Sequence, residues 1–577
     1  KVLLPWTVRG FADDSKFKEF NKEEKNNDNK PKYSQKYRSR DNNNGNRNLG
    51  DIVNSPIVAV GEYLATSAND GMVHIFKQSG GDKRSYNLKL SYIPGTMPRK
   101  DIENKDSTLA KELRAFAEKG YVGDRYGVDG GFVLRRITDD QDKQKHFFMF
   151  GAMGLGGRGA YALDLTKAEN GDPTAVSLFD VKHDNNGKNS NNSVQLGYTV
   201  GTPQIGKTHD GKYAAFLASG YATKDIDNSE NKTALYVYDL ESSGTLIKKI
   251  DVPGGKGGLS SPTLVDKDLD GIVDIAYAGD RGGNMYRFDL SGQDPNQWSV
   301  RTIFSGNKPI TSAPAISQLK DKRVVIFGTG SDLSEEDVDS KEIQHVYGIF
   351  DNDTDTGTAQ DGQGKGLLEQ KLEKDKDGKT LFLSDYKRSD GSGDKGWVVK
   401  LEAGQRVTVK PTVVLRTAFV TIHKYTGNDK CGAETAILGI NTADGGKLTK
   451  KSARPIVPAD NTAVAQYSGH KKTSSGKSIP IGCMEKDNGI VCPNGYVYDK
   501  PVNVRYLDEK KTDGFSTTAD GDAGGSGTFK EGKKPARNNR CFSRKGVRTL
   551  LMNDLDSLDI TGPMCGMKRI SWREVFY

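Results

Sequence analysis

The segment that decides the fold reads SPTLVDKDLDGIVDIAYAGDRGGNMYRFDL, from Ser261 to Leu290. Two short runs of β-branched, aromatic and small apolar residues, Pro262–Val265 and Ile275–Ala278, flank its acidic centre, and a third run ends at Leu290. Turns rich in Gly and Asp separate the runs. The segment therefore predicts an antiparallel meander of short strands.

The same pattern recurs along the chain from Asp51 onward. The copies comprise Ile57–Val60 with Tyr63–Ser67 and Val73–Phe76, Phe132–Ile137 with Phe147–Gly151 and Ala160–Leu163, and then Thr202–Leu240, Ser261–Leu290, Ser312–Phe350 and Val398–Ile440. Several open with a step before proline, namely Ser55-Pro56, Thr202-Pro203, Ser261-Pro262 and Ala313-Pro314. Regular meanders of this kind are typical of propeller blades. With one more blade from the irregular remainder, we expect an all-β, modified seven-bladed β-propeller with loop insertions.

The expected organisation is one large repeat domain with polar additions. Residues 1–50 form a polar N-terminal extension or loop, because their composition cannot bury enough apolar surface to fold alone. The propeller occupies 51–577 and has a short helical insertion at about 101–121, where Leu109, Leu113 and Phe116 recur at helical spacing. Residues 430–577 form an irregular, cysteine-containing part.

The cysteines favour disulfides over a metal site or a redox motif, because no two of them have CxxC spacing. They are Cys431, Cys483, Cys492, Cys541 and Cys565. Cys483 and Cys492 flank the turn signal Asp487-Asn488-Gly489, which could bring their sulfurs together. Cys541 with Cys565 is a second possible pair, leaving Cys431 single, and such bonds would require an oxidising compartment.

The centre of the quoted segment predicts a calcium site. Asp266, Asp268, Asp270 and Asp274 occupy positions 1, 3, 5 and 9 of a loop whose position 6 is glycine. The loop begins like an EF-hand loop, in which alternate side chains turn inward and the carbonyl at position 7, here that of Ile272, adds an oxygen ligand. Four converging carboxylates repel one another unless a cation neutralises them, and hard oxygens favour Ca²⁺ over zinc or copper.

A second acidic stretch, Asp351–Gly357, has the same alternation of carboxylates, at Asp351, Asp353 and Asp355. It continues without a closing carboxylate in register. Whether it binds a second ion stays open at the level of sequence. We expect the carboxylates of the 222–232 loop to be solvated.

Other motif matches do not indicate catalysis or nucleotide binding. Gly201–Thr208 satisfies the P-loop pattern, but a strand rather than a helix is expected after it, and Gly154–Gly159 matches GxGxxG across an expected hairpin. No HExxH or GxSxG motif occurs, so no residue is nominated as catalytic and we expect no enzyme.

The net charge of +8 arises from 84 basic and 76 acidic residues that are mixed along the chain, which argues against nucleic-acid binding. The basic stretch Lys530–Arg548 is interpreted as a solvated loop.

Several segments together resemble the PilC/PilY family. They are Gly50–Pro56, Ala68–Phe76, Tyr92–Pro94, Tyr126–Gly130, the acidic loop with Gly279–Leu290, and Arg569–Glu574. The resemblance implies a propeller that serves type IV pilus biogenesis, twitching motility and host-cell attachment. It implies a location at the cell surface of a Gram-negative bacterium, at the pilus tip or the outer membrane, with pilus subunits or a tip complex and the host-cell surface as partners. Calcium occupancy of the loop is then expected to modulate pilus extension and retraction.

Two other functions fit a Gly-rich propeller. A lectin-like or integrin-like binding module without a pilus role shares the acidic loop. A quinone-dependent dehydrogenase shares the repeated strand and turn pattern, but the chain has only four tryptophans, no adjacent cysteine pair and no repeated docking tryptophan motif. The dehydrogenase is the less favoured of the two.

Overall fold

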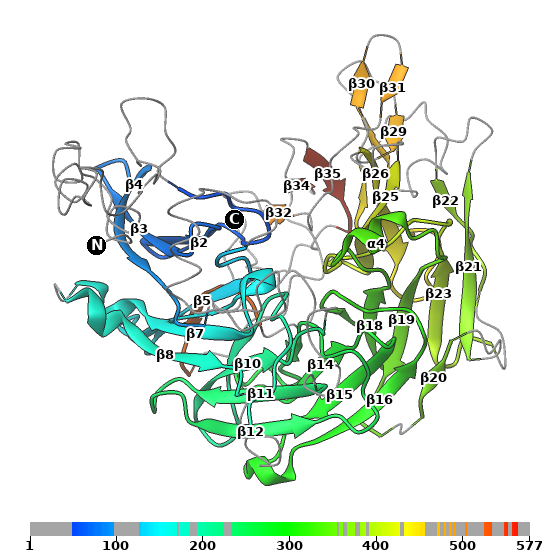
Figure 1. Ribbon diagram of the computed structural model, residues 1–577. Coiled ribbons are helices and arrows are strands. Elements are labelled where there is room, and N and C mark those ends of the chain that lie inside the picture. Colours follow the sequence, from blue (N-terminus) through cyan, green and yellow to red (C-terminus); the bar gives the residue numbers. More distant parts are fainter. Residues whose placement is uncertain are drawn as a thin grey trace, which may run out of the picture. The chain divides into compact units, whose positions relative to one another are not determined.

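Figure 1 shows the computed structural model of the chain. The structure describes residues 49–96, 126–169, 172–184, 193–222, 232–354, 357–361, 366–374, 381–387, 392–426, 432–449 and 451–455, and the segments 470–472, 478–480, 484–486, 489–491, 502–504, 524–532, 547–551 and 557–563. The expected N-terminal extension up to residue 48, the expected helical insertion and all five cysteines lie outside these residues, as does the Arg569–Glu574 segment.

β-strand is the predominant secondary structure of the described residues, so the all-β expectation is confirmed. The chain divides into two compact units. Unit 1 comprises residues 1–262, 290–299 and 524–533, and unit 2 comprises 263–289, 300–523 and 534–577. In the part of the chain that the structure describes, no helix has the length and apolar character needed to cross a bilayer.

Unit 1 contains three antiparallel meanders. The first sheet has the order β1 (Val58–Val60), β2 (Tyr63–Ser67), β3 (Val73–Ser79), β4 (Ser85–Tyr92). The second has the order β33 (Gly527–Lys530), β5 (Phe132–Thr138), β6 (Gln144–Ala152), β7 (Gly159–Asp164), β8 (Ser177–Lys182). The third has the order β12 (Leu246–Asp251), β11 (Ala234–Asp239), β10 (Tyr213–Ala218), β9 (Gln204–Lys207). Short 3-10 turns lie at Gly154–Gly156, Leu165–Glu169, Pro173–Val176 and Pro295–Gln297.

Unit 2 contains the sheet that holds the quoted segment, with the order β13 (Thr263–Val265), β14 (Ile275–Gly279), β15 (Asn284–Asp289), β16 (Ser299–Ser305), β20 (Ala359–Gln360), where Ser299 is counted with unit 1. The next sheet has the order β17 (Ala315–Gln318), β18 (Arg323–Gly328), β19 (His345–Asp351), β23 (Gly396–Lys400), β21 (Leu367–Lys374), β22 (Leu381–Leu383). A short helix, α4 (Glu335–Asp339), lies between β18 and β19 in the chain.

The remaining strands of unit 2 form smaller sheets. One has the order β24 (Thr412–Val414), β25 (Thr417–Thr426), β26 (Gly432–Asn441). Another has the order β27 (Arg454–Pro455), β35 (Ser557–Thr561), β34 (Val547–Leu551), β32 (Val502–Val504). Two hairpins pair β28 (His470–Lys472) with β29 (Ser478–Pro480) and β30 (Met484–Lys486) with β31 (Gly489–Val491).

The expected meanders agree with the observed strands, with one correction. The predicted copy Val398–Ile440 is wrong as a single meander, because β23 pairs with β19 and so belongs to the preceding sheet, while β24, β25 and β26 form a sheet of their own. In the sequence, the last strand of one meander looks like the first strand of the next, because both are short β-branched runs. The pattern alone therefore does not show where one sheet ends. The count of seven blades stays a prediction.

The apolar faces of neighbouring sheets pack together within each unit. In unit 1, Ile75 of β3 and Leu134 of β5 belong to one cluster of buried side chains. In unit 2, Tyr277 of β14, Phe304 of β16 and Tyr347 of β19 belong to another cluster, and each is at most 1% exposed. Removing this apolar surface from water is the main driving force for stacking such sheets.

Aspartates stabilise two of the hairpin turns in the same way. In the turn between β2 and β3, Asp70 accepts a hydrogen bond from the Met72 N–H and lies 2.9 Å from a ring nitrogen of His74. In the turn between β14 and β15, Asp280 accepts from the Asn284 N–H at 2.9 Å and from the Tyr286 hydroxyl at 2.5 Å. Each buried carboxylate thus ties its turn to the strand that follows, as buried polar groups require.

A strand from far along the chain completes the second sheet of unit 1. β33 pairs in parallel with β5, with Phe529 opposite Ile137. The Ser526 hydroxyl accepts a hydrogen bond from the Leu134 N–H at 3.0 Å, across 392 residues of sequence. Glu531 adds an ion pair to Lys145 at 2.5 Å. Unit 1 therefore depends on residues that follow most of unit 2 in the chain.

Replacing Phe529 by Ala should destabilise unit 1, because this side chain is only 7% exposed where β33 joins β5. We expect the free energy of unfolding to fall by about 3 kcal/mol, and the β5 amides to exchange faster with deuterium. Hydrogen exchange read by mass spectrometry measures how fast the amides of β5 and β33 exchange. Thr528→Ala, on the same strand but only partly buried, is the matched control. Unchanged exchange in β5 would contradict the role of β33.

Candidate metal centre

The acidic loop joins the first two strands of the β13–β16 sheet. β13 and β14 pair antiparallel, with Thr263 opposite Tyr277 and Val265 opposite Ile275. One residue beyond this pairing, the Asp274 N–H donates to the Val265 carbonyl at 2.9 Å. The pairing therefore holds the first aspartate of the loop, Asp266, close to the last one.

Three of the predicted carboxylates converge. Asp266, Asp268 and Asp274 each present an oxygen, and these oxygens all lie within 4.8 Å of one another. Asp266 and Asp274 are only 3% and 5% exposed, whereas Asp268 is exposed. The cluster is thus open on one side and could hold a metal ion through oxygen ligands.

Backbone amides hold the two buried aspartates in place. Asp266 accepts hydrogen bonds from the N–H groups of Asp270 at 3.2 Å and Gly271 at 2.7 Å. Asp274 accepts from the Lys267 N–H at 2.7 Å. The loop bends sharply at Gly271, whose φ of +90° a residue with a Cβ rarely adopts, and this explains the glycine at position 6.

Burial and neighbouring carboxylates disfavour the charged form of Asp266. Burial, together with the nearby Asp270, Asp268 and Asp274, raises the pKa of Asp266 to about 7, although the hydrogen bond from the Gly271 N–H opposes the shift. Although its own burial acts in the other direction, hydrogen bonding with Asp266 holds the pKa of Asp268 below its usual value. A bound cation would favour the charged form of all three carboxylates.

The other two predicted ligands lie in the same loop. Asp270 is exposed, lies outside the group of three, and accepts a hydrogen bond from the Ile272 N–H at 2.8 Å. Ile272 is half-buried. Coordination by the Asp270 carboxylate and by the Ile272 carbonyl stays a prediction.

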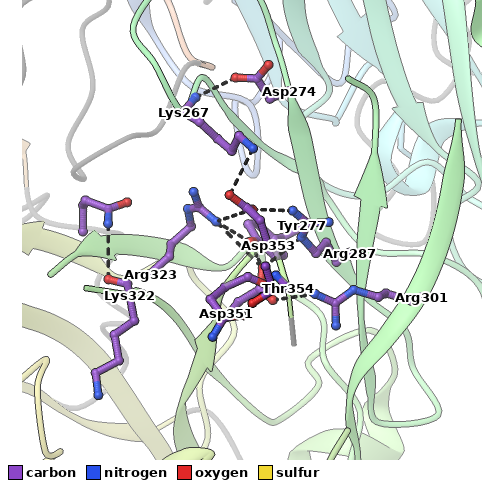
Figure 2. A network of polar contacts seen from close by, with 12 residues as sticks. Lys267, Asp274, Tyr277, Arg287, Arg301, Lys322, Arg323, Asp351, Asp353 and Thr354 are labelled. Carbon is purple, nitrogen blue, oxygen red and sulfur yellow. Dashed lines mark hydrogen bonds and ion pairs between the residues drawn. The ribbon is translucent and has the colours of Figure 1, made fainter. Parts of the chain in front are cut away.

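The second acidic stretch has a different electrostatic environment. Asp351 is buried and forms ion pairs with Arg287 at 3.0 Å, Arg301 at 2.9 Å and Arg323 at 3.8 Å, and it also accepts a hydrogen bond from the Tyr277 hydroxyl. Figure 2 shows these side chains gathered around the carboxylate. Three protein cations thus neutralise Asp351.

Asp353 connects this network to the acidic loop. One of its oxygens lies 2.7 Å from Arg287, and the other lies 3.0 Å from the Lys267 ammonium (Figure 2). Partial burial would raise the pKa of Asp353, but the hydrogen bond and charge of Lys267 and the charges of Arg323 and Arg287 hold it below its usual value. Asp355 lies outside the described residues. No local pattern in the sequence predicts this network, because its arginines come from three different strands, β15, β16 and β18.

The two matches to nucleotide-binding motifs lie among strands, as the sequence predicted. Gly201–Thr208 contains β9, which pairs antiparallel with β10, so no helix follows the loop. Gly154–Gly159 lies in the connection between the paired strands β6 and β7. Neither segment forms the junction of strand, glycine loop and helix that cradles a phosphate.

A cavity of about 300 Å³ lies beside α4 in unit 2. It is lined by Pro309, Ser331, Glu336, Asp337, Ser340, Glu342, Gln344, Gly404, Gln405 and Arg406. The Arg406 guanidinium donates to the carbonyls of Asp337, Ser340 and Gly404, and Glu342 pairs with Lys308 at 2.6 Å. Arg406 therefore stabilises the α4 segment through these hydrogen bonds.

Replacing Asp351 by Ala should strongly destabilise unit 2, because it removes the buried carboxylate that pairs with the buried guanidinium groups of Arg287 and Arg323. We expect a loss of about 3 to 5 kcal/mol in the free energy of unfolding, measured by urea titration with hydrogen exchange of β15 and β18. The control is Asp385→Ala, which removes an exposed pair with Lys387 and should cost about 1 kcal/mol or less. Equal effects of the two variants would contradict this account.

Comparisons with known proteins agree with this architecture. A family model described as the PilY1 beta-propeller domain matches residues 49–387. The type IV pilus biogenesis factor PilY1 of Pseudomonas aeruginosa is 30% identical over 371 residues, which cover 53% of this chain and 29% of that protein. A PilY1 homolog of Xylella fastidiosa is 28% identical over 319 residues, covering 50% of this chain and 19% of that protein. The chain thus spans less than a third of the length of these relatives.

The crystal structure of the Pseudomonas aeruginosa PilY1 C-terminal domain is also similar to the chain. It aligns with a TM-score of 0.56 and 19% sequence identity, covering 87% of this chain and 93% of that chain. At this identity the likeness shows the fold alone. The expected β-propeller class and the expected family are confirmed. With a family model matching more than half of its length, the chain belongs to the PilY1 β-propeller domain family.

Proposed function

We propose that the Asp266–Asp274 loop binds Ca²⁺. The observation that carries the proposal is the convergence of the Asp266, Asp268 and Asp274 oxygens to within 4.8 Å. These three carboxylates would hold the ion, with the Asp270 carboxylate and the Ile272 carbonyl as further ligands. The ion supplies a double positive charge that compensates the cluster.

The donor set supports calcium over other metals. The ligands are carboxylate and carbonyl oxygens, which suit hard cations rather than zinc or copper. Mg²⁺ demands a near-ideal octahedral shell and retains several waters, whereas Ca²⁺ accepts irregular sets of six to eight oxygens. A short loop that offers oxygens from several carboxylates and a main-chain carbonyl, with one side open to water, fits the second description.

Binding would order the hairpin on which the loop is built. Asp266 follows β13 directly and Asp274 precedes β14 directly, so a common ligand would draw the ends of the two strands together. A ligand that binds only the folded state stabilises it by mass action, by about 2.7 kcal/mol at a hundredfold excess over its dissociation constant. Calcium would in this way bias the surface near the loop toward one conformation.

The proposed biological role is in type IV pilus biogenesis and adhesion. The relatives' names support a pilus role, and they are the names of pilus biogenesis factors rather than of enzymes. We infer that the domain acts at the cell surface of a Gram-negative bacterium, at the pilus tip or peripherally at the outer membrane. Its partners would be pilus subunits or a tip complex and the host-cell surface, with no nucleic acid. Calcium occupancy would modulate pilus extension and retraction, and with them twitching motility and attachment.

Asp266→Asn should weaken calcium binding by about tenfold or more, because Asp266 is one of the two buried members of the cluster and accepts two backbone hydrogen bonds. Isothermal titration calorimetry with Ca²⁺, Mg²⁺ and Zn²⁺ measures affinity and preference. Thermal melts with and without chelator show whether the folded state depends on the ion. Asp294→Asn, a capping residue outside the loop, is the control. Unchanged calcium affinity in Asp266→Asn would contradict the site.

The pilus role is tested in cells that carry the full-length protein. A chromosomal Asp266→Asn substitution should change the amount of surface pili and reduce twitching, because the loop would lose its ion while most of the domain stays folded. Pilus shearing assays and twitching zones measure these effects, with Asp294→Asn as the control strain. Normal piliation and motility in a strain whose purified domain has lost calcium binding would refute the modulation.

A further inference from the structure

The acidic loop contains its own cation. Lys267 lies in sequence between two of the three converging aspartates, Asp266 and Asp268, and its N–H donates to the third, Asp274, at 2.7 Å. The flexible four-carbon side chain of Lys267 is long enough to bring its ammonium to these carboxylates. Its ammonium is therefore a potential internal counter-ion for the cluster.

In the structure the Lys267 ammonium forms its ion pair with a carboxylate outside the cluster. It lies 3.0 Å from one oxygen of Asp353 (Figure 2). Asp353 comes from the segment that follows β19, 86 residues along the chain. The contact is a long-range ion pair between the loop and a different sheet of unit 2, and not a product of local sequence.

Asp353 is itself held in position by the arginine network. Its other oxygen accepts a hydrogen bond from Arg287 at 2.7 Å, and Arg287 also binds the buried Asp351 at 3.0 Å. The Arg287 side chain is only 8% exposed, so the fork of its guanidinium fixes both carboxylates. The acceptor for Lys267 is therefore a preorganised group.

We propose that Asp353 is a positioning residue for the metal site. By pairing with the Lys267 ammonium, it withholds this ammonium from the carboxylates of Asp266, Asp268 and Asp274. The inference rests on the proposed function of the loop. With Asp353 in place, the cluster keeps its negative charge for a divalent cation. Without it, the ammonium turns to the nearest carboxylates and competes with the metal for them.

Two physical effects of Asp353 have to be separated. Its own negative charge attracts any cation in the neighbourhood, whether or not Lys267 is present. The withholding effect exists only when residue 267 carries an ammonium. A double-mutant cycle over Lys267 and Asp353 isolates the second effect, because the coupling free energy vanishes if the two residues act independently.

The experiment measures Ca²⁺ affinity by calorimetry for the wild-type chain, Asp353→Asn, Lys267→Gln and the double variant. We expect Asp353→Asn to weaken binding about fivefold, the range of a partly exposed ion pair. Lys267→Gln should bind as tightly as wild type or more tightly. The double variant should match Lys267→Gln within about a factor of two, so that loss of the ammonium rescues the loss of Asp353.

The matched control is Asp385→Asn, which removes the acceptor of another lysine ion pair, Lys387, at 2.6 Å and should leave calcium affinity unchanged. Thermal melts in chelator verify that every variant folds. If Asp353→Asn weakens calcium binding equally in the wild-type chain and in the Lys267→Gln variant, Asp353 does not act by withholding the ammonium. That outcome would overturn the proposed role of Asp353 and leave the calcium site intact. Unchanged affinity in Asp353→Asn would do the same. A wild-type chain that binds no divalent cation would overturn the proposed function, and this inference with it.

Discussion

The pairing of β13 with β14 is the constraint on which the candidate site depends. Because Val265 lies opposite Ile275, the residues just beyond the pair, Asp266 and Asp274, meet at the mouth of a nine-residue loop. The loop then satisfies its buried carboxylates with its own N–H groups, including that of Gly271. A slip of one residue in the register would turn one of these aspartates to the other face of the sheet.

Two acidic stretches with similar spacing illustrate how the environment decides the chemistry of a carboxylate. In the Asp266–Asp274 loop the negative charges face one another, and backbone amides provide the hydrogen bonds. At Asp351 the neighbouring strands contribute guanidinium groups, and the carboxylate becomes part of a buried ion-pair network. Since a buried charge must be paired, the first arrangement could hold an external cation, whereas protein guanidinium groups pair with the carboxylate in the second. Asp353 and Lys267 lie where the two arrangements meet.

Long-range pairing also organises the sheets within each unit. β33 joins β5 in parallel, and β21 joins β23 in parallel, although all the meanders themselves are antiparallel. Parallel pairing requires a long connection, so it brings together segments that are far apart in sequence. Closing such long loops costs entropy, which the buried side chains of the joined strands offset. The β33–β5 pairing at the edge of the second sheet of unit 1 therefore forms only when residues 527–530 are available.

The sequence by itself determined the all-β class, most individual strands and the spacing of the acidic loop. These are local properties: alternation, turn residues and carboxylates at fixed intervals act over a few neighbouring residues. Only the tertiary structure decided that Val398 belongs to the sheet of β19, that β33 completes the sheet of β5, and that arginines neutralise Asp351. These features depend on contacts between residues tens to hundreds of positions apart, and no local pattern encodes which partner a strand edge or a buried charge will meet.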